Sequence, residues 1–150
     1  MKTNLGASAP ILFVLLVIGV CGCMEPEIIV DFRTIEDEGH VCLNQDGELG
    51  VEVFFNACLS GSCDSVDESG CEIAVDGETI TVSSWLTIKT EYEAGQGCTA
   101  DCGVVSTTCT ADALDAGEYE LQHGQGSMTV TIPGEGEICG AGESPIHAPE

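Results

Sequence analysis

The sequence predicts an all-β fold, a small disulfide-rich β-sandwich of about seven strands. Short runs in which apolar and polar residues alternate recur along the chain, and turn-forming residues separate them at regular intervals. No segment shows sustained helical periodicity. The chain of 150 residues has 10 Cys but only 5% aromatic residues, so we expect a small core that covalent cross-links reinforce.

Two strands are expected in the first part of the folded region. Apolar side chains share one parity over residues 28–32, and a second alternating run covers residues 51–55. The acidic segment 34–40 between them is expected to be a loop. From 56 to 70 the composition turns to Cys, Ser, Gly and Asp, which predicts a disulfide-linked loop.

The clearest hairpin signal lies at Asp76-Gly77. Alternating runs over 71–75 and 78–82 flank this dipeptide, which is typical of a type I′ turn because both central residues need positive φ. The side chains expected to face inward are Ile73, Val75, Ile80 and Val82.

The second strand of that hairpin is expected to continue further along the chain. Leu86 and Ile88 keep the same parity, whereas Ser84 interrupts it, so we predict a bulge near Ser83-Ser84. Trp85 has the opposite parity and is either a second-layer core residue or an exposed aromatic contact.

The remaining elements are a loop, a strand, a hairpin and a tail. Their expected bounds are 94–102 for the loop, 105–109 for the strand, 118–121 and 128–132 for the hairpin strands, 123–126 for their turn, and 134–150 for a flexible Gly-rich tail. Pro133 is expected to end the last strand because it has no amide donor.

The start of the last hairpin supplies a resemblance. Asp115-Ala-Gly-Glu-Tyr119-Glu-Leu121 resembles the D-x-G-x-Y-x-C stretch of immunoglobulin domains, in which the tyrosine forms the tyrosine corner. Leu121 stands where that family has a cysteine, so the usual inter-sheet disulfide is absent at this position. The resemblance implies an Ig-like sandwich and, because a fold does not carry function, no activity.

The N-terminus is expected to be a cleaved targeting segment. Lys2 precedes an apolar run over 11–20, which suits a signal peptide and is too short to span a membrane. Val20-Cys21-Gly22-Cys23 then resembles the lipobox of bacterial lipoproteins, with Cys21 in place of the usual small residue. That resemblance implies cleavage after residue 22 and a lipid on Cys23. Cleavage by the ordinary signal peptidase, with release of a soluble protein, is the alternative.

These boundaries divide the chain into four expected parts. They are a signal peptide at 1–22, a lipid anchor and acidic tether at 23–40, the sandwich at 41–133 and the flexible tail at 134–150. The run C-T-A-D-C, the later L-x-A-G-x-Y and the closing V-T-I-P also resemble small Cys-rich lipoproteins of myxobacteria. This resemblance implies a class of lipoprotein and says little about its mechanism.

The cysteine count agrees with lipidation and disulfides together. If Cys21 is removed and Cys23 carries lipid, an even number remains to pair in an oxidising compartment, namely Cys42, Cys58, Cys63, Cys71, Cys98, Cys102, Cys109 and Cys139. Simple secretion leaves one odd thiol. Zinc sites favour C-x2-C pairs, which this chain lacks, so we expect disulfides and no metal site. Connectivity stays open, and only Cys71 with Cys109 is suggested, because both lie on expected strands.

Charge excludes some classes of function. With 26 Asp and Glu against 3 Lys and Arg, the chain lacks the basic surface that nucleic-acid binding needs. Acids gather at Asp64, Asp67 and Glu68, and at Asp112 and Asp115, but the EF-hand pattern is missing. We expect a solvated acidic surface there, and a calcium site is the alternative.

No catalytic constellation emerges from the sequence. His123 falls in a predicted turn and His147 in the tail, so both are expected to be exposed without a role, and His40 has no evident partner. The chain has no G-x-S-x-G motif and no Gly-rich phosphate loop before a helix. We therefore expect no enzyme activity, no catalytic residues and no cofactor.

The resulting hypothesis is a lipid-anchored, disulfide-stabilised protein of the bacterial cell envelope, facing an oxidising compartment, with the outer membrane favoured if the source is Gram-negative. It would act as a non-enzymatic binding, adhesion or structural module, held to the membrane by its N-terminal lipid. A protein partner is expected to contact loops 56–70 and 94–103. The alternative is a secreted disulfide-rich inhibitor or a calcium-dependent binding protein.

Overall fold

The computed structural model describes residues 26–44, 49–134 and 136–142, and this part of the chain is all-β. It contains nine strands in two sheets and no helix, so the predicted all-β sandwich is confirmed, with nine strands in place of about seven. A helix long and apolar enough to cross a membrane is therefore absent from the described residues.

The strands follow one another along the chain with short connections. Their bounds are β1 Ile28–Glu36, β2 His40–Asn44, β3 Leu49–Leu59, β4 Asp64–Asp76, β5 Thr79–Glu93, β6 Gly103–Ala111, β7 Gly117–His123, β8 Gly126–Ile132 and β9 Glu137–Gly142.

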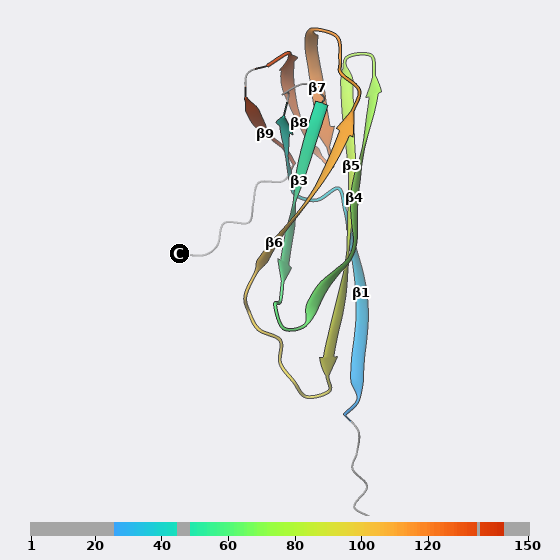
Figure 1. Cartoon of the computed structure of the whole chain (residues 1–150), viewed down its shortest axis with the longest axis vertical. Helices are drawn as coiled ribbons and strands as arrows, with labels where there is room; N and C mark the ends of the chain where they lie inside the picture. The colour runs from blue at the N-terminus through green and yellow to red at the C-terminus, as the bar shows by residue number, and fades with distance from the viewer. Residues whose placement is uncertain (1–25, 45–48, 135, 143–150) are drawn as a thin grey trace, which may run out of the picture.

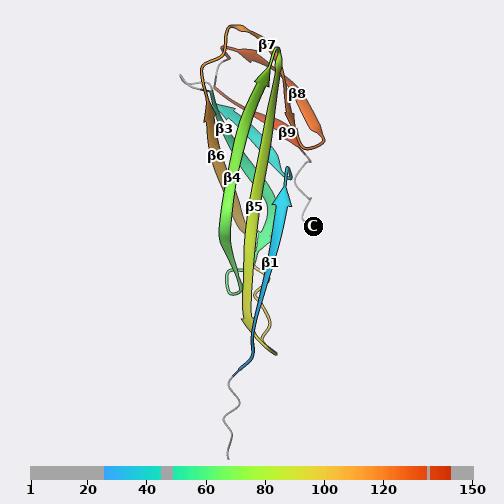
Figure 2. The same cartoon turned by 90° about the vertical axis from the view of Figure 1, so that its right-hand side faces the viewer.

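The first sheet is built around the long strand β5. On one edge, β5 pairs antiparallel with β1 through residues 85–93 and parallel with β7 through residues 79–82, so β1 and β7 lie end to end. On its other edge β5 pairs with β4, and β8 continues the sheet beyond β7. Figure 2 shows β4, β5 and β1 side by side along the length of the molecule.

The second sheet has the order β6-β3-β2-β9 and packs against the first (Figure 1). The core lies between them, because alternate residues of facing strands point inward. Its fully buried apolar side chains are Val41, Leu43, Val51, Val53, Ile80, Val82, Leu86, Ile88, Leu121 and Val130.

Three segments expected to be irregular contain strands. The expected loop 56–70 holds the end of β3 and the start of β4, and the expected loop 34–40 holds the end of β1 and the start of β2. The expected tail contains β9, which pairs with β2. These stretches are rich in Ser, Gly, Cys and acids, so their own β-propensity is low, and pairing with a neighbouring strand decides their conformation.

The predicted hairpin between β4 and β5 is present, with its turn displaced by one residue. Asp76 pairs with Thr79, so the two turn residues are Gly77 and Glu78. Gly77 has φ 60° and Glu78 has no positive φ. A single positive φ at the first central position is the type II′ geometry, so the predicted type I′ turn is wrong.

The four side chains expected to face inward from this hairpin divide into two pairs. Ile80 and Val82 on β5 are buried, whereas Ile73 is half-buried and Val75 is exposed. The difference follows from position, because β5 lies inside its sheet and β4 forms an edge.

The bulge lies on β4 rather than on β5. The register shifts between Val66 and Glu68, which leaves Asp67 as the extra residue, and no shift occurs at Ser83-Ser84. Ser84 therefore keeps the inward parity of its strand and is buried.

The eight cysteines expected to pair form four disulfides. Cys71–Cys109 links β4 to β6 and so joins the two sheets, in the pairing suggested by the sequence. Cys42–Cys139 links the neighbouring strands β2 and β9. Cys58–Cys102 and Cys63–Cys98 both connect the region where β3 ends and β4 begins with the segment between β5 and β6. Four disulfides indicate an oxidising, extracellular or envelope compartment.

Candidate functional site

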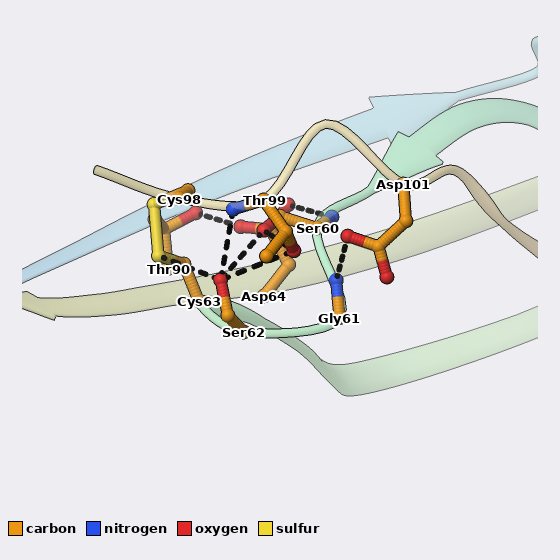
Figure 3. Close-up of a disulfide and its surroundings, with 9 residues drawn as sticks. All are labelled: Ser60, Gly61, Ser62, Cys63, Asp64, Thr90, Cys98, Thr99 and Asp101. Atoms are coloured by element: carbon orange, nitrogen blue, oxygen red, sulfur yellow. Dashed lines mark hydrogen bonds between the residues drawn. A yellow bond between two sulfur atoms is a disulfide. The ribbon is translucent and has the colours of Figure 1, made fainter.

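Two loops far apart in the sequence meet at one end of the molecule. We call this region the stapled tip and define it as residues 58–64 and 94–102. The disulfides Cys58–Cys102 and Cys63–Cys98 span 44 and 35 residues of sequence and hold the two loops together. Figure 3 shows the second of these bonds and the polar side chains around it.

Hydrogen bonds between side chains and backbone fix the two loops against each other. The Thr99 amide donates to Ser62 Oγ at 2.9 Å, and the Gly61 amide donates to Asp101 Oδ1 at 3.2 Å (Figure 3). Ser60 Oγ lies 3.2 Å from Thr99 Oγ1. Each of these bonds crosses from one loop to the other, so the surface is ordered before any partner arrives.

The two acids of the stapled tip are held as carboxylates. Asp64 accepts from Thr90 Oγ1 at 2.6 Å and from the Ser60 amide at 2.8 Å, and these bonds lower its pKa below the ordinary value. The pKa of Asp101 is likewise lowered, first by Thr99 and then by backbone amides that include Gly61. Both groups therefore carry negative charge at neutral pH, with oxygens already engaged by the chain.

The structure brings together only part of the two loops expected to bind a partner. Residues 58–64 and 94–102 form one surface, whereas residues 65–70 continue along β4 away from it. Leu59 is 8% exposed and packs in the core, so it is not available to a partner. Val66 and Val104 are exposed, at 43% and 80%.

The acids that suggested a calcium site do not converge. Asp64 is bonded to the chain, Asp67 occupies the bulge, and Glu68 lies beyond it on β4. Within the described ranges, the one group of three or more His, Cys, Asp or Glu residues close enough to share an ion is Cys42, Glu137 and Cys139. The two sulfurs of that group are joined in a disulfide, which leaves a single carboxylate.

His123 is buried, contrary to the exposed turn position expected for it. The turn of its hairpin comprises residues 124–125, so His123 is the last residue of β7 and is 1% exposed. Its Nε2 lies 2.9 Å from Oγ of Ser84, which is 3% exposed. Its Nδ1 is buried without a hydrogen-bond partner. The signal that sequence reasoning missed was the shared odd parity of Tyr119, Leu121 and His123.

A serine, a histidine and an aspartate lie close together here without forming a catalytic triad. Asp37 Oδ1 accepts from the Ser84 amide at 2.7 Å, not from the imidazole. Burial lowers the pKa of His123, and the Asp37 carboxylate opposes that shift. Because Ser84 and His123 are closed off from solvent, the pair acts as a polar contact within the core and cannot meet a substrate.

Asp37 also closes the junction where β1 gives way to β7 along β5. Its own amide donates to the Ser84 carbonyl oxygen at 3.0 Å, and its φ is 53°. Both polar groups of the Ser84 backbone are thereby satisfied on the edge of β5 where neither β1 nor β7 pairs with this residue.

The remaining singled-out side chains have structural surroundings. His40 stacks on Phe54, its partner across β2 and β3, with ring centroids 4.9 Å apart. Trp85 is half-buried on the outer face of its sheet, where its ring lies against Gly70, and an aromatic contact with another molecule stays a prediction. Tyr119 Oη donates to the Asp115 carbonyl oxygen at 3.0 Å, which is the contact of a tyrosine corner.

An open groove lies over β7 and β8. It has a volume of about 590 Å³, and three glutamates, Glu78, Glu118 and Glu120, line it together with Tyr119 and hydroxyl side chains. The residues lining this groove include no histidine or cysteine to act as base or nucleophile. The predicted lipidation site Cys23, the signal peptide and His147 lie outside the described residues.

Comparison with known proteins gives no match. No protein-family model matches the chain, and no curated protein and no solved structure is significantly similar to it. The functional argument therefore depends on the residues and their geometry.

Proposed function

We propose that this protein is a non-enzymatic binding module of the cell envelope, anchored by a lipid on Cys23, whose stapled tip binds a protein partner. The observation that carries the proposal is the cross-linking of two exposed loops into one ordered surface by two disulfides and several hydrogen bonds. Binding residues lie disproportionately on loops that a rigid scaffold positions.

Rigidity is what makes the stapled tip suited to binding. A flexible loop loses conformational entropy when a partner immobilises it, at a cost of roughly 0.5–1.5 kcal/mol for each ordered side chain. In the stapled tip part of that ordering is already made, because Ser62, Thr99 and Asp101 are held across the loops. Contacts to a partner therefore contribute more fully to affinity.

Charge indicates the chemistry of the partner. The whole chain has a net charge of −23, and Asp64 and Asp101 in the stapled tip are ionised at neutral pH. A basic protein surface complements this charge and is steered toward it, whereas nucleic acid and anionic lipid headgroups are repelled.

The proposed anchor places the stapled tip close to the membrane. The Ala94 amide donates to the Glu27 carbonyl oxygen at 2.8 Å, so the tip adjoins the start of β1. An extended segment from Cys23 to Ile28 spans at most about 17 Å. We therefore expect the partner to be a protein of the same membrane, or one bound close to its surface.

The anchor is tested by the intact mass of the protein from its native membrane, with and without thiol alkylation. The expected result is the mass of residues 23–150 plus acyl chains, with no alkylated cysteine before reduction. A mass without lipid, or an alkylated thiol in the unreduced protein, contradicts lipidation of Cys23.

The binding role is tested by removing one disulfide at a time. The double variant Cys63→Ala/Cys98→Ala loosens the stapled tip. The matched control is Cys42→Ala/Cys139→Ala, which removes a disulfide remote from the tip. The control disulfide closes a loop of 97 residues, whereas the tip disulfide closes one of 35. Loop-closure entropy makes the control lose at least as much stability. In-cell crosslinking followed by affinity purification identifies the partner. The purified partner is then expected to bind wild type and the control variant, and the tip variant is expected to lose this binding. Equal binding by all three proteins contradicts the proposal.

A further inference from the structure

Strand β1 leaves a long edge of the first sheet open. It pairs with β5 over nine residues without a register shift. Among the described residues, no strand pairs with its other edge, which Figure 2 shows along one side of the sheet. Natural edge strands are usually shortened, bulged, interrupted by proline or charged to prevent pairing with another chain. β1 has no bulge and no proline over its nine residues, and its charged side chains, Asp31, Arg33 and Glu36, include both signs.

The side chains of β1 add an apolar stripe to that open edge. Ile28, Val30 and Phe32 are 50%, 47% and 56% exposed on the outer face of the sheet. The Phe32 amide donates to Asp31 Oδ1, an exposed bond within β1 itself. A strand added to this edge would receive the remaining backbone donors and acceptors together with apolar neighbours, and at Phe32 it would displace the Asp31 carboxylate from the amide.

We propose that a second copy of this chain occupies the edge, with the two β1 strands antiparallel about a twofold axis at Phe32. The directly opposed residues are then Ile28 with Glu36, Ile29 with Ile35, Val30 with Thr34, Asp31 with Arg33, and Phe32 with Phe32. Twofold symmetry repeats each unlike pair, so the dimer has two Asp31–Arg33 pairs flanking a central pair of phenylalanines.

This register is the one that the charges of β1 favour. A shift by one residue would oppose core-facing side chains to outward-facing ones, so only even shifts keep the faces matched. A shift by two residues in one direction places Asp31 opposite Asp31, and in the other direction Arg33 opposite Arg33. Like charges directly opposite each other destabilise a sheet, and opposite charges stabilise it.

Arg33 has the capacity for the additional contact. Its Nη2 donates to the Cys58 carbonyl oxygen at 3.2 Å, and a guanidinium has further donors for a carboxylate of the second copy. The chain has only 3 Lys and Arg residues, and one of them stands two positions from an aspartate on the open edge. The net charge of −23 opposes association, so ionic strength near that of the cell is needed to screen it.

The test measures molar mass by sedimentation equilibrium from low to high micromolar concentration at about 0.15 M salt. The full chain purified from its membrane in detergent is compared with the full chain carrying Cys23→Ser, so that association through a lipid is recognised. Both forms are expected to dimerise. Asp31→Arg alone and Arg33→Asp alone each turn two attractive pairs into repulsive ones, and each is expected to raise the dissociation constant at least about tenfold.

A mixture supplies the decisive control. Asp31→Arg in one chain and Arg33→Asp in the other restore both pairs, so the two variants are expected to associate with each other although neither associates with itself. The double variant Asp31→Arg/Arg33→Asp is expected to dimerise like wild type. Circular dichroism and the melting temperature of each variant verify that it is folded.

Three results would overturn the proposal. A wild-type chain that stays monomeric at high micromolar concentration shows that the edge has no second copy as its occupant. A dimer that neither single variant weakens is formed through another surface. Folded single variants that lose association but do not associate with each other show that Asp31 and Arg33 do not face one another.

Discussion

The burial of His123 gives the folded state a defined dependence on pH. The imidazole is 1% exposed, its Nε2 is 2.9 Å from Ser84 Oγ, and its Nδ1 has no hydrogen-bond partner. A protonated ring would carry a charge and a donor at Nδ1 into a site that offers no acceptor for it. Acid is therefore expected to destabilise the protein before its carboxylates titrate.

The sign and size of the effect follow from the direction of the shift. Burial lowers the pKa of His123 below its ordinary 6.5, and the Asp37 carboxylate offsets this only in part. Between the folded and unfolded pKa values the unfolded chain binds the extra proton, so the free energy of unfolding falls as pH falls below about 6.5. The slope is at most about 1.4 kcal/mol per pH unit, and the loss ends below the folded-state pKa.

The assay is guanidinium unfolding of the disulfide-intact protein between about pH 7.5 and about pH 5.5. Over this window wild type is expected to lose up to about 1.4 kcal/mol more than His123→Gln. Glutamine keeps a polar partner for Ser84 without titrating. The control is Gly97→Ala, which changes no titratable group and meets no atom within 4 Å, so it is expected to keep the wild-type slope. Equal slopes for wild type and His123→Gln would refute the assignment of the pH dependence to His123.

Three further substitutions test individual contacts. Gly70→Ala places a Cβ against the ring of Trp85, so it is expected to lower the free energy of unfolding by about 1–3 kcal/mol and to shift the fluorescence emission of this single tryptophan. Gly97→Ala, whose Cβ meets no atom within 4 Å, is expected to leave both quantities unchanged. Tyr119→Phe removes the bond to the carbonyl oxygen four residues earlier, and chemical denaturation is expected to show a loss of about 1 kcal/mol; no change would mean that water replaces the bond. Asp37→Ala is expected to lower the free energy of unfolding by about 2–4 kcal/mol in the same assay, because the Ser84 amide loses its acceptor and alanine disfavours a φ of 53°. A loss below about 1 kcal/mol would contradict this account.

Local patterns predicted those parts of the fold in which neighbours in the sequence are also neighbours in space. The alternating runs around residue 77 specify a hairpin and its register, although the single positive φ makes the turn type II′. The stretch from Asp115 to Tyr119 predicts the hydrogen bond of a tyrosine corner, which is present. The Ig-like topology that this stretch suggested stays a prediction, and in the described residues the last hairpin joins β5 through a parallel pair.

The candidate site was predicted as two separate loops and found as one surface. Their Cys, Ser, Gly and Asp content indicated a disulfide-linked region, but eight cysteines permit about a hundred pairings. The structure pairs Cys58 with Cys102 and Cys63 with Cys98, and this choice is what joins the loops. No local pattern specifies such a pairing, because it depends on where β3, β5 and β6 end in space.

Alternation, turn residues and cysteine number are local or compositional properties, so they were enough to predict the all-β class, the hairpins and the use of cysteines for cross-linking. Which face of each strand is covered depends instead on how the two sheets pack against each other. Periodicity marks the stripe of Ile28, Val30 and Phe32 as apolar in the same way as the buried positions of β5, yet the second sheet covers one and leaves the other in solvent. The same packing places His123 in the core, because burial is a relation between strands distant in the sequence.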